Sequence, residues 1–134
     1  LNLVRSPMNP KILIIDRSEH FCELIRIRLL NYGFRAFSLA QSGTEGLARF
    51  SKEDPQIVLM DVNLGDVKGA ELCRRMKELG GDRVKIILMS GMAEPNQSAA
   101  AREAGADDYA VKAFDCVDII LAIKRLTVAA GQIV

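Results

Sequence analysis

The stretch IVLMD, residues 57–61, joins four apolar residues to an aspartate, and the turn-like segment VNLGDVKG follows it. Apolar residues that do not alternate with polar ones predict a short strand buried on both faces, as in a parallel sheet covered by helices. Aspartate disfavours strands, and a buried carboxylate costs free energy unless it is paired. Asp61 therefore either simply terminates the strand or belongs to a functional site, and the residues at the other strand ends decide between the two.

Four other runs of the same kind occur along the chain, and helix-like stretches separate them. With Gln56 to Asp61, the expected strands are residues 11–16, 34–39, 84–90 and 108–112. The expected helices run from Ser18 to about Asn31, from Ser42 (a capping box with Glu45), and over 69–79, 95–104 and 116–130. This alternation predicts a doubly wound α/β fold, with a five-stranded parallel sheet flanked by five helices.

The composition is that of an ordinary globular domain. The chain has 134 residues, 49% of them apolar and 26% charged, with a net charge of +1, so no basic excess suggests nucleic-acid binding. No apolar run approaches the ~20 residues that cross a bilayer, and three widely spaced cysteines favour a reducing cytoplasm. We expect one domain at 10–131, after an extension or cloning remnant at 1–9 and before a short tail at 132–134.

Polar side chains follow most of the expected strands at the point where each strand ends. Asp16 and Arg17 follow the first strand, Asp61 ends the third, Ser90 the fourth and Lys112 the fifth. In doubly wound sheets, ligands bind outside the carboxyl ends of the strands. These side chains are therefore expected to lie together in one site.

Four ordered segments resemble the receiver domain of two-component response regulators, which has the CheY-like, flavodoxin-like fold. They are ILIID (12–16), IVLMDVNLGDVKGAEL (57–72), IILMSG (86–91) and AGADDYAVKAF (104–114). The resemblance covers essentially residues 11–130. It implies a signalling module rather than an enzyme, with a histidine kinase or phosphotransfer protein upstream and an output domain or downstream protein as its target.

The resemblance also implies a role for each residue at the strand ends. Asp61 would be the phosphoacceptor, and Mg²⁺ would be held by Asp16, Asp61 and the main-chain carbonyl of Asn63. Lys112 would place a second positive charge on the phosphoryl group. The Ser90 hydroxyl would turn toward that group, and Tyr109 would fill the space that it leaves.

Arg17 departs from the family pattern, because it stands where the second acidic residue is expected. A guanidinium stays protonated and cannot bind a metal, so the affinity for Mg²⁺ should fall or be lost. Three arrangements are open. Arg17 points to solvent beside a weak metal site, forms an ion pair with Asp61, or supports phosphotransfer in place of the metal.

Two further departures are Ala113 and Gly65, which stand where the family has prolines. Without a proline, the Lys112–Ala113 peptide is expected to be trans, which puts the reach of Lys112 in doubt. An atypical pseudo-receiver that signals by protein contact, without Mg²⁺-dependent phosphorylation, is the main alternative function.

Two functions from different protein classes fit the sequence less well. An aspartate-nucleophile phosphohydrolase would need a second acid where Asn63 stands, and a nucleotide binder would need a phosphate loop after the first strand. The last helix carries more apolar residues than one face needs, which suggests a homodimer or partner surface.

Overall fold

The computed structural model describes residues 9–92 and 95–129. The rest of the chain, which includes most of the expected extension at 1–9, the tail at 132–134 and the expected helix end at Ala130, lies outside the described residues. Strands and helices alternate as predicted: β1 (Lys11–Ile15), α1 (Glu19–Asn31), β2 (Ala36–Ala40), α2 (Gly43–Glu53), β3 (Ile57–Asp61), α3 (Gly69–Gly80), the 3₁₀ turn η1 (Gly81–Arg83), β4 (Lys85–Ser90), α4 (Pro95–Glu103), β5 (Asp108–Val111) and α5 (Val117–Ala129).

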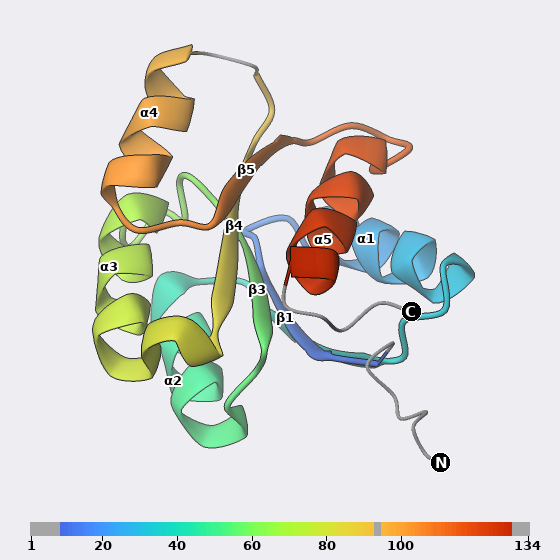
Figure 1. Ribbon diagram of the computed structural model, residues 1–134, viewed down its shortest axis with the longest axis horizontal. Helices are drawn as coiled ribbons and strands as arrows, with labels where there is room; N and C mark the ends of the chain where they lie inside the picture. The colour runs from blue at the N-terminus through green and yellow to red at the C-terminus, as the bar shows by residue number, and fades with distance from the viewer. Residues whose placement is uncertain (1–8, 93–94, 130–134) are drawn as a thin grey trace.

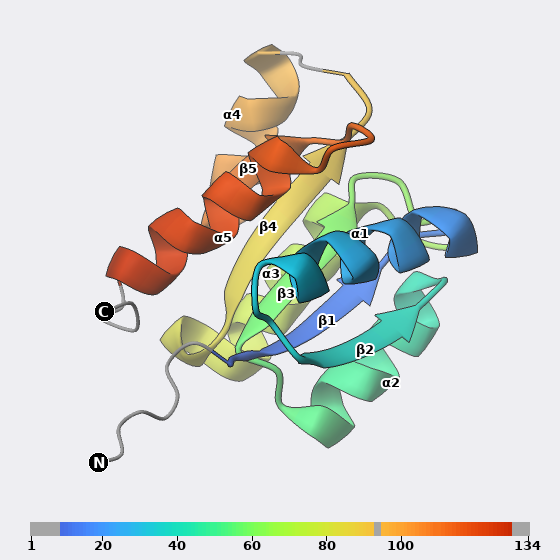
Figure 2. The ribbon, with the colours of Figure 1, turned by 90° about the vertical axis from the view of Figure 1, so that its right-hand side faces the viewer.

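The strands form one parallel sheet in the order β2-β1-β3-β4-β5, which confirms the predicted fold class. Helices α1 and α5 cover one face, and α2, α3 and α4 cover the other (Figures 1 and 2). Alternate residues of β1 enter the two cores: Ile12 and Ile14 pack under α1 and α5, whereas Leu13 and Ile15 pack on the opposite side. Burial on both faces explains why the strand sequence is apolar throughout.

The second strand begins and ends later than the sequence predicts. The apolar pattern indicates residues 34–39, whereas β2 runs from Ala36 to Ala40 at the edge of the sheet. Phe34 is buried in the core just before the strand, so its apolar character reflects packing rather than pairing. Ala40 is paired with Ile15, and its carbonyl accepts a hydrogen bond from the Asp16 amide.

The start of each of the first two helices follows the predicted capping chemistry. The Ser18 hydroxyl accepts a hydrogen bond from the Phe21 amide, and the Ser42 hydroxyl accepts one from the Glu45 amide. The Glu45 carboxylate accepts a hydrogen bond from the Gln41 amide, one residue before the position of a standard capping box.

The apolar surplus of α5 is mostly core. Ile119, Ile120 and Ile123 are buried, whereas Val117 and Leu121 are exposed. The large apolar content of this helix therefore comes mainly from packing against β4, β5 and α1. No helix in the described part of the chain, α5 included, is both long and apolar enough to cross a membrane.

At the centre of the sheet, between β1 and β3, the order of the strands reverses, and the connections lead to opposite edges. From β1 the chain passes through α1 to β2 at one edge, and from β3 it passes through α3 to β4 on the other side. The connections therefore leave β1 and β3 on opposite faces and open a crevice at their carboxyl ends. The register pairs Ile15 with Met60, so the residues that follow each of them lie side by side at this crevice.

Candidate functional site

The Lys112 ammonium bridges two carboxylates at the crevice. Its Nζ lies 2.8 Å from Asp16 Oδ2 and 3.2 Å from Asp61 Oδ1. Three residues separated by up to 96 positions thus meet where the predicted strands end, because β5 lies next to β4 and delivers Lys112 to the same edge. The described peptide bonds are all trans, so Lys112 reaches the site without the proline that the family pattern expects.

Asp16 is the most buried member of the group, with 2% of its surface exposed. One carboxylate oxygen, Oδ1, accepts a hydrogen bond from the Ser18 amide at 2.9 Å. The other, Oδ2, is buried, and its partner in the described part of the chain is the Lys112 ammonium at 2.8 Å. A buried carboxylate of this kind is stable only with such a partner.

Lys112 is held as a charged ammonium. Burial by itself would lower the pKa of Lys112, but hydrogen bonding and charge attraction from Asp16, and then from Asp61, outweigh it and raise the pKa above its ordinary value. The Phe21 ring from the first turn of α1 also faces the ammonium, with its centroid 4.5 Å from Nζ. Lys112 therefore stays protonated at neutral pH and offers one positive charge to the two carboxylates.

The loop after β3 is shaped around Asp61. The Asn63 amide donates to Asp61 Oδ2 at 3.2 Å, and the Gly65 amide donates to Asn63 Oδ1 at 3.1 Å. Gly69 begins α3 directly against the end of β3, where an added Cβ would overlap the Asp61 carbonyl oxygen and crowd the Val62 backbone. A side chain at position 69 would therefore displace the strand end that positions the carboxylate.

Arg17 does not join the acidic pair. Its side chain is exposed and lies along the Gly65 turn, so that a Cβ built on Gly65 would be 3.0 Å from Arg17 Cδ and 3.5 Å from Nη1. Among the described residues, the ion pairs of Asp61 and Asp16 are with Lys112 and not with Arg17. The predicted arrangement in which Arg17 pairs with Asp61 is therefore not the one that the chain adopts.

The donors near the crevice do not fit the Mg²⁺ site that the resemblance implied. Two carboxylates, Asp16 and Asp61, converge there with the Asn63 main chain, but no cluster of three acidic, histidine or cysteine side chains suited to a metal occurs in the described part of the chain. The Arg17 guanidinium stands in place of the expected third carboxylate and repels a divalent cation. An ammonium already bridges the remaining pair.

The two residues of the predicted switch, Ser90 and Tyr109, both form hydrogen bonds with the main chain of Met92. The buried Ser90 hydroxyl accepts a hydrogen bond from the Met92 amide at 3.3 Å, and the Tyr109 hydroxyl donates to the Met92 carbonyl at 2.8 Å. The Gln97 side chain on α4 lies 3.2 Å from the same tyrosine hydroxyl. Met92 therefore contacts both Ser90 and Tyr109, and Tyr109 in turn contacts α4.

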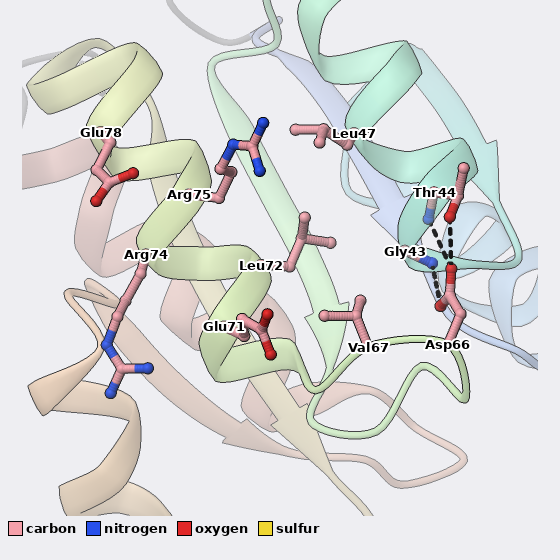
Figure 3. Close-up of a pocket in the computed structure, with 10 residues that line it drawn as sticks. All are labelled: Gly43, Thr44, Leu47, Asp66, Val67, Glu71, Leu72, Arg74, Arg75 and Glu78. Carbon is pink, nitrogen blue, oxygen red and sulfur yellow. Dashed lines mark hydrogen bonds between the residues drawn. The ribbon is translucent and has the colours of Figure 1, made fainter.

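A second carboxylate site lies at the other end of the loop after β3. Asp66 caps the N-terminus of α2: its side chain accepts hydrogen bonds from the Gly43 and Thr44 amides and from the Thr44 hydroxyl, at 2.8–2.9 Å (Figure 3). These hydrogen bonds, those of the backbone first, lower the pKa of Asp66 to about 2. We call this arrangement the Asp66 clamp; it borders a groove of about 350 Å³ between α2 and α3.

The cysteines are excluded as reactive groups. Cys22, Cys73 and Cys116 are all buried and free. Burial raises the pKa of Cys22 to about 12 and that of Cys73 to about 11, so neither forms the thiolate that nucleophilic chemistry needs at neutral pH.

Sequence reasoning missed several participants. Phe21 falls in the first turn of an expected helix, and its position one turn after the first strand was the only signal that it faces the site. Asp66 lies 23 and 22 residues from its helix-capping partners Gly43 and Thr44, so its role could be recognised only in the fold. Met92 contacts Ser90 and Tyr109 through its main-chain amide and carbonyl, so its side-chain type gave no signal in the sequence.

The comparisons with known proteins agree with this geometry. The family model described as "Response regulator receiver domain" matches residues 12–124. The phosphate regulon transcriptional regulatory protein PhoB of Rhizobium meliloti is 30% identical over 120 residues, which are 89% of this chain and 52% of PhoB. The chemotaxis protein CheY of Bacillus subtilis is 26% identical over 88% of this chain and 98% of CheY. The chain spans about half the length of PhoB and of two further regulators that match it, YclJ of Bacillus subtilis and MprA of Mycolicibacterium vanbaalenii.

A solved structure gives the same result. The CheY-like response regulator receiver domain protein of Methanospirillum hungatei superposes with a TM-score of 0.81 at 28% identity, over 92% of this chain and 97% of that one. The family model covers most of the chain, and the five-stranded parallel sheet with five helices matches the CheY-like fold. This chain therefore belongs to the family of response regulator receiver domains and has the CheY-like fold.

Proposed function

We propose that this receiver domain accepts a phosphoryl group on Asp61 from a histidine kinase or a phosphotransfer protein. The observation that carries the proposal is the Lys112 ammonium 3.2 Å from Asp61 Oδ1, because a cation beside a carboxylate nucleophile lowers the charge repulsion toward an incoming phosphoryl group. We propose further that Mg²⁺ is bound weakly or not at all, since Arg17 replaces an expected carboxylate.

The output follows from the Met92 link. A phosphoryl group on Asp61 offers oxygens that the Ser90 hydroxyl can reach by rotating away from the Met92 amide. Met92 also holds the Tyr109 hydroxyl, so this rotation frees the tyrosine and changes the surface of β5 and α4. That surface would bind an output domain or a downstream protein, with no role for nucleic acid or membrane in this domain.

The remaining parts of the proposal concern setting and assembly. We expect the domain to act in the cytoplasm. We expect it to act as a signalling module and not as an enzyme. A homodimer through α5 would use the exposed Val117 and Leu121, because Ile123 belongs to the core. Sedimentation of Leu121→Glu tests that assembly, since loss of a dimer is expected only if this face is the seam.

A pseudo-receiver that signals by protein contact is the second candidate, and the guanidinium at position 17 favours it. Intact-mass measurement after incubation with acetyl phosphate separates the two. We expect a single phosphoryl adduct in the wild-type chain and in Asp82→Asn, an exposed control aspartate, and none in Asp61→Asn. An adduct that persists in Asp61→Asn would contradict the assignment, and its absence from every sample would favour the pseudo-receiver.

A further inference from the structure

We propose that Arg17 is a phosphoryl-binding residue: with Lys112 it supplies the positive charge that a metal ion would otherwise bring, so that Asp61 is phosphorylated without Mg²⁺. The inference rests on the proposed function, because it concerns the same acceptor. It gives a function to Arg17, which follows the first strand but makes no ion pair with Asp16 or Asp61.

The charges in the crevice create the need for a second cation. Two carboxylates, Asp16 and Asp61, share the single ammonium of Lys112. An aspartyl phosphate carries about −1.5 to −2 charge at neutral pH in place of the single negative charge of the carboxylate. One ammonium therefore leaves the phosphorylated crevice more negative than before, while Asp16 remains buried beside it.

Arg17 is the cation placed to meet that need. It follows Asp16 directly, and its side chain runs along Gly65, four residues after Asp61. Hydrogen bonds connect this turn to the acceptor, because the Gly65 amide holds Asn63 and the Asn63 amide holds Asp61. The guanidinium thus lies over the loop that forms the rim of the crevice.

The conformation of Gly65 makes room for this side chain. Its φ is +87°, in the left-handed region, where a residue with a Cβ is strained. A Cβ would also press on Arg17 Cδ at 3.0 Å. The Asp66 clamp fixes the next residue of the loop to α2, so the surface on which Arg17 rests is anchored on its far side.

The chemistry of a guanidinium suits a phosphoryl group. Its planar fork of N–H donors binds two phosphoryl oxygens at once, and it keeps its charge at every physiological pH. Arg17 makes no ion pair with a carboxylate in the described ranges 9–92 and 95–129. Its donors are therefore free for an anion that arrives at Asp61.

The transfer balances without a metal or a proton. With an acyl phosphate as donor, an Asp61 carboxylate oxygen forms a bond to phosphorus while the bond from phosphorus to the acyl oxygen breaks. The acyl group leaves as a carboxylate with that electron pair. Lys112 and Arg17 neutralise charge on the phosphoryl oxygens during the step and in the product.

The experiment follows the phosphoryl adduct by intact mass with acetyl phosphate, once with EDTA and once with Mg²⁺. The variants are Arg17→Ala, Arg17→Asp, Asp61→Asn and the matched control Arg26→Ala, an arginine of α1 that pairs with Glu23. We expect the wild-type chain and Arg26→Ala to be labelled in EDTA. Arg17→Ala should be labelled at least tenfold more slowly, and Arg17→Asp only with Mg²⁺.

Labelling in EDTA that is equally fast in the wild-type chain and in Arg17→Ala overturns this inference. Labelling of the wild-type chain that requires Mg²⁺ and is unchanged in Arg17→Ala overturns this inference and leaves the proposed function standing. No adduct in the wild-type chain under either condition overturns the proposed function itself, and the inference with it.

Calorimetric titration with Mg²⁺ provides a readout that does not depend on phosphorylation. We expect no saturable binding at millimolar Mg²⁺ in the wild-type chain and a measurable site in Arg17→Asp, because a third carboxylate then joins Asp16 and Asp61. Tight Mg²⁺ binding by the wild-type chain would overturn the inference. Circular dichroism checks that the variants fold, which the exposure of Arg17 leads us to expect.

Discussion

The crevice and the Asp66 clamp lie on the same loop after β3 but hold their carboxylates in opposite ways. In the crevice, Asp16 and Asp61 depend on one shared charge, the Lys112 ammonium. In the clamp, three uncharged donors of the α2 N-terminus satisfy Asp66 by hydrogen bonds alone. The ion pairs of Lys112 can rearrange when a phosphoryl group arrives at Asp61. The hydrogen bonds of Asp66, in contrast, hold the loop to α2 and are part of the stable fold. The start of the loop, at Asp61, is therefore the part suited to react, and the part at Asp66 fixes the loop in place.

The largest effect is expected from Lys112→Ala, which breaks the crevice. Removing the ammonium leaves Asp16 buried without a partner, and we expect a loss of about 2 kcal/mol or more in unfolding free energy. The ~3–5 kcal/mol of a fully buried pair is an upper limit, because the Lys112 side chain is 20% exposed. Denaturant unfolding measures the loss.

A matched double variant tests the cause. Asp16→Asn combined with Lys112→Ala removes the stranded charge and should recover most of the lost stability. An equal loss in the single and double variants would mean that Lys112 stabilises the fold through its packing on Phe21 instead.

A smaller effect is expected from Gly43→Ala, which disturbs the clamp by steric overlap. An added Cβ would overlap Val67 Cγ1 and come within 3.1 Å of Asp66 Oδ1, so the loop must shift. We expect a loss of about 1–2 kcal/mol, typical of overpacking at a tight site. Gly91→Ala is the control, because nothing lies within 4 Å of its Cβ. Similar thermal midpoints for both variants would show that the clamp tolerates displacement.

The smallest effect, and the sharpest test of the contrast, is the pH dependence of the clamp. The pKa of Asp66 is about 2 in the folded chain, below the ~3.9 of an unfolded aspartate. A depressed pKa stabilises the fold above pH ~4, and this contribution disappears as the pH falls toward 2. The difference in thermal midpoint between the wild-type chain and Asp66→Ala should therefore shrink over that interval. A constant difference between the wild-type chain and Asp66→Ala over that interval would contradict the assignment.

The sequence predicted the alternating elements and the meeting of Asp16, Asp61 and Lys112 because buried parallel strands read as apolar runs and their ends share one edge. It misjudged β2, since Phe34 looks like a strand residue but packs before the strand, and Ala40 pairs in spite of its low strand propensity. It could not orient Arg17, because a long exposed side chain takes its direction from a loop that is distant in sequence. The role of Asp66 was missed because its hydrogen-bond partners, Gly43 and Thr44, are distant in sequence.

The contact between Arg17 and Gly65 has an evolutionary consequence. A guanidinium that rests on a turn without a side chain makes the two positions a coupled pair of substitutions, because a proline at position 65 could adopt neither the φ of +87° nor the space beside Arg17. Among relatives, arginine at the first position should therefore co-occur with glycine at the second. A proline introduced at position 65 while Arg17 remains would meet a steric barrier, so position 65 should change only in lineages that have already lost the arginine.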